Sequence, residues 1–209
     1  IVRYTPTRLN GKPAYATLLE DLLASKTLPA IAFGQHSCSL KWKIAPQTRA
    51  LEQWQPAKNA WAHGKTVTRL IGYDASPRDI RRYGQSPRHY DPRFSNRFPL
   101  IEWQWDRAAC ENRIRKAGLP PLRKSSCFFC TACKADDVNS LPRDHLKLIV
   151  LLEAAAAPRL TTTEGLWRKS TKGRRGPPRP GRITDFISDT ALLSPDDAAD
   201  VAKKLLPAL

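Results

Sequence analysis

Three cysteines at positions i, i+3 and i+6, namely Cys127, Cys130 and Cys133, restrict this chain more than any other feature of its sequence. A Cys-x-x-Cys turn points both sulfurs to one side of a tight loop, where backbone N–H groups can hydrogen-bond the thiolates and a nearby cation lowers the thiol pKa. A single cysteine is most simply explained by packing. For this triple spacing, flanked by lysines, we predict that the loop binds a metal ion or an iron–sulfur cluster.

The charge of the chain restricts its partners. The 209 residues carry 35 Lys and Arg against 19 Asp and Glu, a net charge of +16. A balance this basic favours a polyanionic partner such as a nucleotide, tRNA or DNA. The sequence has no apolar run near the roughly 18 residues that cross a bilayer, so we expect no membrane partner. Five cysteines, an odd number, fit a reducing compartment, and we expect a cytoplasmic protein.

Hydrophobic periodicity predicts a mixed α/β chain. Apolar residues at helical spacing, caps and turn residues predict helices over residues 18–23, 40–54, 77–82, 106–117, 146–157 and 198–206. β-branched and apolar runs predict strands over residues 1–4, 66–74 and 99–103. The strand at 66–74 is expected to be buried, and residues 84–98 are expected to form a loop. We divide the chain into an α/β domain, residues 1–158, and a basic arm with a terminal helix, residues 159–209.

Arginines surround the end of the best predicted strand. Arg69 lies in the strand, and Arg78 and Arg81 follow it at the start of a predicted helix. Ligands of open α/β sheets bind at the carboxyl ends of the strands. Arginines near a helix N-terminus are unfavourable unless an anion offsets them. These three residues are therefore our candidates for binding phosphate, with a solvated helix face as an equally simple explanation.

The order of three motifs resembles the sulfonucleotide (phosphoadenosine phosphosulfate) reductase-like family of the PP-loop ATP pyrophosphatase superfamily. Residues 38–51 are similar to the family's Cys-Cys-x-x-Arg-Lys-Val-x-Pro segment, and residues 99–106 to its Pro-Leu-x-Asp-Trp segment. Residues 119–131 are similar to its Leu-Pro followed by Cys-x-Pro-Cys-Thr. The resemblance implies the C-terminal portion of an open parallel sheet of the adenine nucleotide alpha hydrolase type, with a cysteine-rich cluster-binding loop.

The resemblance also implies a ligand set. Cys38, Cys127 and Cys130 match ligands of a [4Fe–4S] cluster, and Lys43 matches the family's lysine between cluster and substrate, our candidate catalytic residue. Such a cluster usually takes four thiolates, but Ser39 replaces the second cysteine of the pair. The fourth ligand is then Cys133, Cys110 or His36. We favour Cys110, because its predicted helix runs directly into the cysteine loop.

Two departures from the family limit the transfer of function. The segment Gly72-Tyr73-Asp74 lacks the family's sulfate-binding arginines, and no cysteine follows Cys133 to act as the mobile nucleophile. Both argue against sulfate reduction. The family's glycine-rich phosphate loop is also absent, and we expect it upstream of Ile1 or on a partner chain. Residues 1–209 alone are therefore not expected to hydrolyse ATP.

Two hypotheses follow. The first is a PP-loop enzyme that uses ATP or another adenine nucleotide and an iron–sulfur cluster, in sulfur transfer or in modification of DNA or tRNA. The second is a non-catalytic, zinc-binding nucleic-acid-binding protein. Its Zn²⁺ would be held by Cys127, Cys130, Cys133 and either Cys38 or His36. In both, the Gly/Pro-rich basic segment 168–182, which we expect to form no core, binds phosphates.

Overall fold

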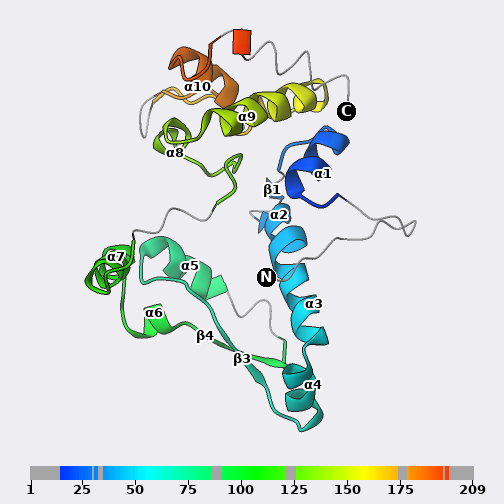
Figure 1. Cartoon of the computed structure of the whole chain (residues 1–209), viewed down its shortest axis with the longest axis vertical. Coiled ribbons are helices and arrows are strands. Elements are labelled where there is room, and N and C mark those ends of the chain that lie inside the picture. Colours follow the sequence, from blue (N-terminus) through cyan, green and yellow to red (C-terminus); the bar gives the residue numbers. More distant parts are fainter. Residues whose placement is uncertain are drawn as a thin grey trace. The chain divides into compact units, whose positions relative to one another are not determined.

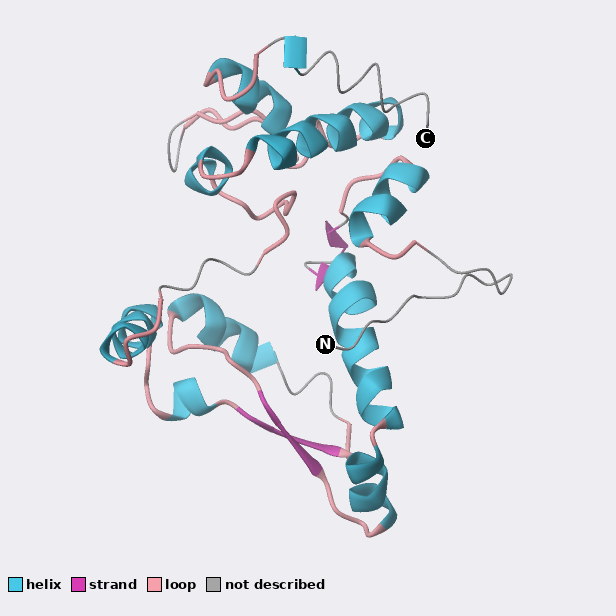
Figure 2. Cartoon of the chain, in the orientation of Figure 1, coloured by secondary structure: helices cyan, strands magenta, loops and turns pink. Residues whose placement is uncertain are grey.

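The computed structural model describes residues 15–29, 31–32, 35–85, 91–120, 126–173, 178–194 and 196–197, with the backbone alone for residues 31, 32, 35, 36 and 85. The chain forms two compact units, labelled by element in Figure 1. The first unit comprises Ile1–Gln47 and Ser125–Leu209, and the second comprises Thr48–Lys124. The fold is mixed α/β, mostly helical, with a small parallel two-stranded sheet (Figure 2).

The first unit is largely helical. Its elements are α1 (Leu18–Ser25), β1 (Ile31–Ala32), β2 (Gln35–His36), α2 (Ser37–Ser39), the π-helix η1 (Leu40–Ile44), α8 (Ala135–Asn139), α9 (Arg143–Ala156), the 3₁₀ turn η3 (Ala157–Arg159) and α10 (Ile183–Asp189). Helix α3 (Ala45–Gln53) continues directly from η1. β1 and β2 form a short antiparallel pair. Helix α1 begins with a capping box, in which Thr17 and Glu20 each bond the other's backbone N–H.

The core of the first unit is built around α9. Ile149 and Leu152 of this helix are fully buried, and the apolar cluster around them includes side chains of α1, of the cysteine loop and of α10. Burial of this apolar surface is the main source of the unit's stability. We expected residues 159–209 to be a basic arm with a terminal helix. The described part of that range instead contributes Leu166, Trp167, Ile183, Ile187 and Leu193 to the core.

One carboxylate lies inside this core. Glu153 of α9 is 1% exposed and accepts hydrogen bonds from the N–H groups of Leu166 (2.7 Å), Ile183 (3.0 Å) and Thr184 (2.8 Å), and from the Thr184 hydroxyl (2.5 Å). Two of these N–H groups belong to the first turn of α10, where intrahelical acceptors are lacking. Glu153 therefore caps α10 from a different helix and joins the 165–184 region to α9.

The second unit contains a βαβ arrangement. Its elements are α4 (Gln55–Ala62), β3 (Val67–Leu70), α5 (Pro77–Gln85), β4 (Phe94–Arg97), α6 (Pro99–Glu102) and α7 (Arg107–Lys116). β3 and β4 pair in parallel, from Val67 opposite Phe94 to Leu70 opposite Arg97. Because α5 lies between them in the sequence, they form a parallel pair joined by a helical crossover. Figure 2 shows the two strands in magenta.

Most of the helices expected from the sequence are present. α1, α5, α7 and α9 lie at or within a few residues of the expected positions, and residues 40–53 are helical. The expected cap of α7 is confirmed, because Asp106 Oδ1 accepts from the Ala109 N–H at 2.8 Å. No helix among the described residues has the length and apolar character needed to span a bilayer.

The strand predictions need correction. Residues 99–102 form α6, because Pro99 is pre-set for a first helical turn and the Phe98 carbonyl accepts from Ile101 and Glu102. Residues 94–97, expected to lie in a loop, form β4 by pairing with β3. β3 covers only part of residues 66–74 and is half exposed rather than buried, with Leu70 70% exposed. The strand at 1–4 and the helix at 198–206 lie outside the described residues.

Candidate functional site

The cysteine loop folds as two successive tight turns. The Cys130 N–H donates to the Cys127 carbonyl at 3.0 Å, and the Cys133 N–H donates to the Cys130 carbonyl at 3.0 Å. Cys127 and Cys130 are partly buried, whereas Cys133 is 4% exposed and packs in the core. None of the three forms a disulfide bond within the described residues. The loop therefore holds two partly accessible sulfurs and one sulfur that faces the core.

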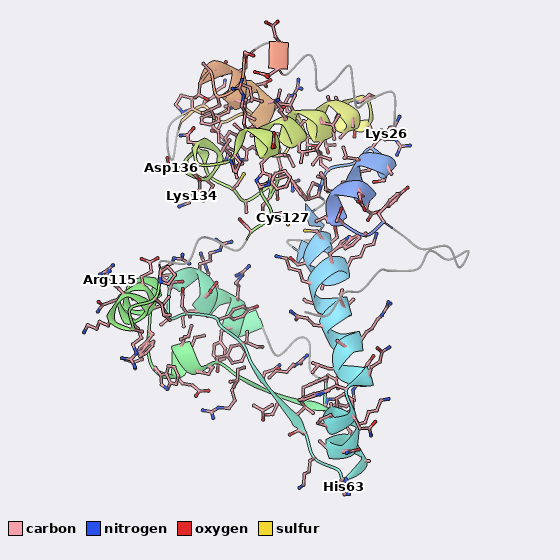
Figure 3. All side chains as sticks on the ribbon, viewed as in Figure 1. Lys26, His63, Arg115, Cys127, Lys134 and Asp136 are labelled. Carbon is pink, nitrogen blue, oxygen red and sulfur yellow. The ribbon has the colours of Figure 1, made fainter. Side chains whose placement is uncertain are left out.

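A fourth thiol from a distant part of the sequence lies near this loop. Burial raises the pKa of the Cys127 thiol, and the neighbouring thiols of Cys130 and Cys38 raise it further, whereas the ammonium of Lys43 lowers it. Cys38 and Lys43 belong to α2 and η1, so the structure places these elements beside the loop; Figure 3 labels Cys127 there. Three of the cysteines expected to act together, and the expected lysine, are thus grouped in the first unit.

The helix that carries Cys38 and Lys43 is irregular between them. Residues Leu40–Ile44 form a π-helix, whose hydrogen bonds span one residue more than those of an α-helix. Such π-helical turns are rare and occur frequently at functional sites. Lys41, in the same turn, forms an ion pair with Asp21 of α1 at 2.6 Å, whereas the exposed Lys43 has no ion-pair partner among the described residues. Lys43 is therefore the lysine of this turn that is available to a ligand.

Three buried polar atoms around the cysteine loop have no hydrogen-bond partner in the part of the chain that the structure describes. They are Trp42 Nε1, Thr131 Oγ1 and His145 Nδ1. Trp42 precedes Lys43, Thr131 follows Cys130, and the His145 ring stacks on Phe128 with centroids 4.2 Å apart and an interplanar angle of 4°. Buried polar groups are nearly always paired, so an unpaired one calls for a water, an ion or a functional role.

The chemical types of these side chains therefore suit a thiolate-bound metal centre. Thiols from two segments are grouped, a cation lies beside them, and unpaired polar atoms lie on the same segments (Trp42 and Thr131) and on α9 (His145). Within the described side chains, however, no three His, Cys, Asp or Glu groups are close enough together to hold a metal ion as they stand. The expected ligation by Cys38, Cys127 and Cys130 stays a prediction, and it requires the thiols to draw together on binding.

The candidates for a fourth ligand lie in different places. Cys133 is in the cysteine loop, with its carbonyl accepting from Trp167 Nε1 at 2.9 Å. Cys110 is on α7 in the second unit, where burial raises its pKa, the carboxylates of Asp74 and Asp106 raise it further and Arg107 lowers it. The side chain of His36 lies outside the described residues. Cys133 is thus the candidate that already shares a loop with two expected ligands.

The three arginines expected to bind phosphate belong to the second unit and have different environments. Arg69 Nε donates to Asn96 Oδ1 at 2.9 Å, and its guanidinium lies 3.9 Å from the Phe94 ring centroid. It thus ties β3 to β4. Arg78 and Arg81 are exposed on α5 and form no ion pair within the described residues. Arg78 and Arg81 are therefore free to meet a phosphate, whereas Arg69 is already engaged.

Sequence reasoning did not identify Trp42, Thr131 or His145 as part of this site. Trp42 and Thr131 lie within the motifs 38–51 and 119–131, so the sequence already places them close to Cys38 and Cys130. The sequence gives no such signal for His145, because its stacking on Phe128 arises from tertiary packing of α9 on the cysteine loop.

Comparison with protein-family models, with curated proteins and with solved structures finds no match to this chain. The family resemblance therefore rests on the three motifs alone.

Proposed function

We propose that this chain binds a [4Fe–4S] cluster through Cys38, Cys127 and Cys130, as part of a PP-loop nucleotide-dependent enzyme related to the sulfonucleotide reductases. The observation that carries the proposal is the grouping of Cys38 with the two loop thiols beside Lys43. A packing role does not require cysteines of two distant segments to meet next to a cation. The free thiols fit a reducing compartment, and we place the protein in the cytoplasm.

The residues of the site have separate roles in this proposal. The three thiols, with Cys133 or Cys110 as the fourth, hold the cluster, which would supply electron storage or structural support when bound. Lys43 lowers the pKa of Cys127 and so favours the thiolate that ligation requires. Its exposed ammonium also presents a positive charge to an anionic substrate at the same place.

In this proposal, the second unit binds the nucleotide. β3, α5 and β4 form a parallel crossover of the kind from which open α/β sheets are built. Arg78 and Arg81 follow the carboxyl end of β3, where they would meet the phosphates of ATP or another adenine nucleotide. The described glycines with positive φ follow α4 and α7 or lie at Gly173. None of these three described glycines follows a strand and opens a helix, and in this proposal the phosphate cradle is supplied by an upstream segment or a partner chain.

Substitution of single cysteines tests the ligand set. Cys38→Ser should remove most of the bound iron, measured per protein after purification without oxygen, because the site loses the sulfur from its second segment. Lys41→Gln serves as the control, since it changes the neighbouring π-helical turn without removing a ligand, and its only described ion pair is with Asp21, so it should keep the iron. Among Cys110→Ser and Cys133→Ser, the one that loses iron identifies the fourth ligand.

The same measurement separates the two hypotheses. Zinc at one ion per chain without iron, in a colourless protein, would support the zinc-binding alternative. That alternative is favoured by the three closely spaced cysteines of one loop. Iron content that is unchanged in Cys38→Ser would contradict the assignment of Cys38.

A further inference from the structure

The described residues on the two sides of the basic segment, 168–173 and 178–182, pair with each other. Thr171 and Arg179 face each other as an antiparallel pair, with N–H···O distances of 2.8 Å and 3.2 Å in the two directions. The Trp167 N–H donates to the Gly181 carbonyl at 3.0 Å and closes the base. We call the described residues 168–173 and 178–182 the basic hairpin.

The basic hairpin is fixed to the cysteine loop. Trp167, 3% exposed, donates from Nε1 to the Cys133 carbonyl oxygen at 2.9 Å. The guanidinium of Arg179 lies 4.6 Å from the Trp167 ring centroid, and Phe186 of α10 packs edge-on against the same ring at 5.3 Å. A cation over a partly desolvated indole is held by the ring quadrupole. One tryptophan therefore joins the base of the hairpin to the loop that carries the candidate ligands.

Most described cations of the hairpin lack an acidic partner, although Arg182 pairs with Asp185 at 3.9 Å. Arg168, Lys169 and Lys172 are exposed and form no ion pair within the described residues. The closest acid in sequence, Glu164, accepts from the Ser170 N–H and hydroxyl at 3.2 Å. Its carboxylate thus holds the turn. Arg168, Lys169 and Lys172 are therefore exposed cations without an acidic partner in the described chain.

Arg168 has an unfavourable backbone conformation. Its φ is +72°, in the left-handed region that glycine adopts without strain and other residues rarely adopt. Its carbonyl accepts from the Glu164 N–H at 2.5 Å and its N–H donates to the Gly165 carbonyl at 2.9 Å, so the turn imposes this conformation. Glycine would suit the turn better. The presence of arginine there is consistent with a role for its guanidinium, since strained residues gather at functional sites.

We propose that the exposed cations of the basic hairpin bind the sugar–phosphate backbone of a nucleic acid and hold it beside the cysteine loop. A membrane surface is a poorer fit, because the hairpin has no large apolar side chain to insert. Exposed cations that lie close together in the sequence suit a polymer with regularly spaced phosphates. This inference goes beyond the proposed function and does not depend on the metal centre.

Two matched double variants test the proposal. Lys169→Gln with Lys172→Gln removes two charges from the hairpin. Lys58→Gln with Lys65→Gln removes the same charge from two exposed lysines of the second unit that form no ion pair within the described residues. Binding of fluorescein-labelled single-stranded DNA and RNA oligonucleotides is measured by anisotropy over a range of salt concentrations, with metal content measured separately on each sample.

The hairpin variant should bind roughly tenfold more weakly near 0.1 M salt and lower the log–log salt slope by about 1.4, at about 0.7 per single-strand phosphate contact. The second-unit control should leave the slope unchanged. Comparison of the DNA and RNA titrations shows which nucleic acid the hairpin binds more tightly. Equal losses in both double variants would overturn the proposal, as would an unmodified protein that binds neither strand at low salt.

A third variant distinguishes weaker binding from loss of folding. Arg168→Gly should weaken oligonucleotide binding several-fold without lowering the thermal unfolding temperature, because glycine relieves the positive φ while removing the guanidinium. Unchanged binding in Arg168→Gly would overturn the role of Arg168. An unmodified protein that binds oligonucleotide but contains no iron would contradict the proposed function and leave the present proposal intact.

Discussion

At the scale of single residues, Glu153 is the side chain on which the first unit depends most. Its buried carboxylate accepts four hydrogen bonds from three residues, and each donor lies in the 166–184 region rather than on α9 itself. Hydrogen bonds to charged groups are stronger than neutral ones, and a buried donor left unpaired is costly. Glu153 therefore stabilises the attachment of this region to the core.

We predict that Glu153→Gln lowers the free energy of unfolding by about 3 kcal/mol, since the amide offers only one acceptor oxygen and places an NH₂ group against N–H donors. Chemical denaturation measures the change. Glu111→Gln is the control: Glu111 forms only an exposed ion pair with Arg107 and should cost less than about 0.5 kcal/mol. Similar losses in the two variants would contradict this account of Glu153.

The electrostatics of Cys127 predict how metal binding responds to pH. Burial and the neighbouring thiols raise the pKa of Cys127, and ligation requires the thiolate. Affinity for Co²⁺, followed by its thiolate absorption, should therefore increase as pH rises from about 6 to 8, because protons compete less below the thiol pKa. Lys43→Gln should move this rise to higher pH, since Lys43 lowers the Cys127 pKa. A rise at the same pH in both proteins would contradict the role of Lys43.

At the scale of elements, the 165–182 region packs so closely on α9 that side-chain size is restricted at its glycines. A Cβ atom at Gly165 would lie 2.5 Å from Glu153 Oε1 and 2.8 Å from the Arg182 Cα. The second of these atoms is backbone and cannot move aside without displacing the start of α10. A Cβ atom at Gly72, by contrast, would meet nothing within 4 Å.

We predict that Gly165→Ala lowers the free energy of unfolding by about 2 to 3 kcal/mol through this overlap. Gly72→Ala, which makes the same chemical change at a position without positive φ, should be within about 0.5 kcal/mol of the unmodified protein. Thermal or chemical unfolding compares the two. A Gly165→Ala protein as stable as Gly72→Ala would show that the loop repacks freely on α9.

The elements predicted correctly are those whose determinants are local. α1 and α7 carry their own caps, at Thr17 and Asp106, and α9 has an apolar face of its own. β4 could not be predicted, because Ser95, Asn96 and Arg97 are poor strand formers and become a strand only by pairing with β3. The strand predicted over residues 99–103 was wrong for a local reason: apolar residues after a proline suit a helical turn as well as a strand.

At the scale of the whole molecule, the sequence indicated which thiols and which lysine to expect together, but not what surrounds them. The cysteine spacing and the motif order indicated Cys38, Cys127, Cys130 and Lys43, which the structure groups in the first unit. The attachment of the basic hairpin to the cysteine loop through Trp167 required the fold, because the Nε1–H to Cys133 hydrogen bond links residues far apart in sequence.

The central claim of this account is that the grouped thiols hold an iron–sulfur cluster. The most direct measurement is the iron and acid-labile sulfide content of the unmodified 209-residue chain, purified without oxygen or reconstituted with iron and sulfide, together with its visible spectrum. We expect about four iron and four sulfide per chain and a broad absorption in the visible that fades in air. A colourless protein without iron or sulfide after reconstitution, with its far-UV circular dichroism intact, would contradict it.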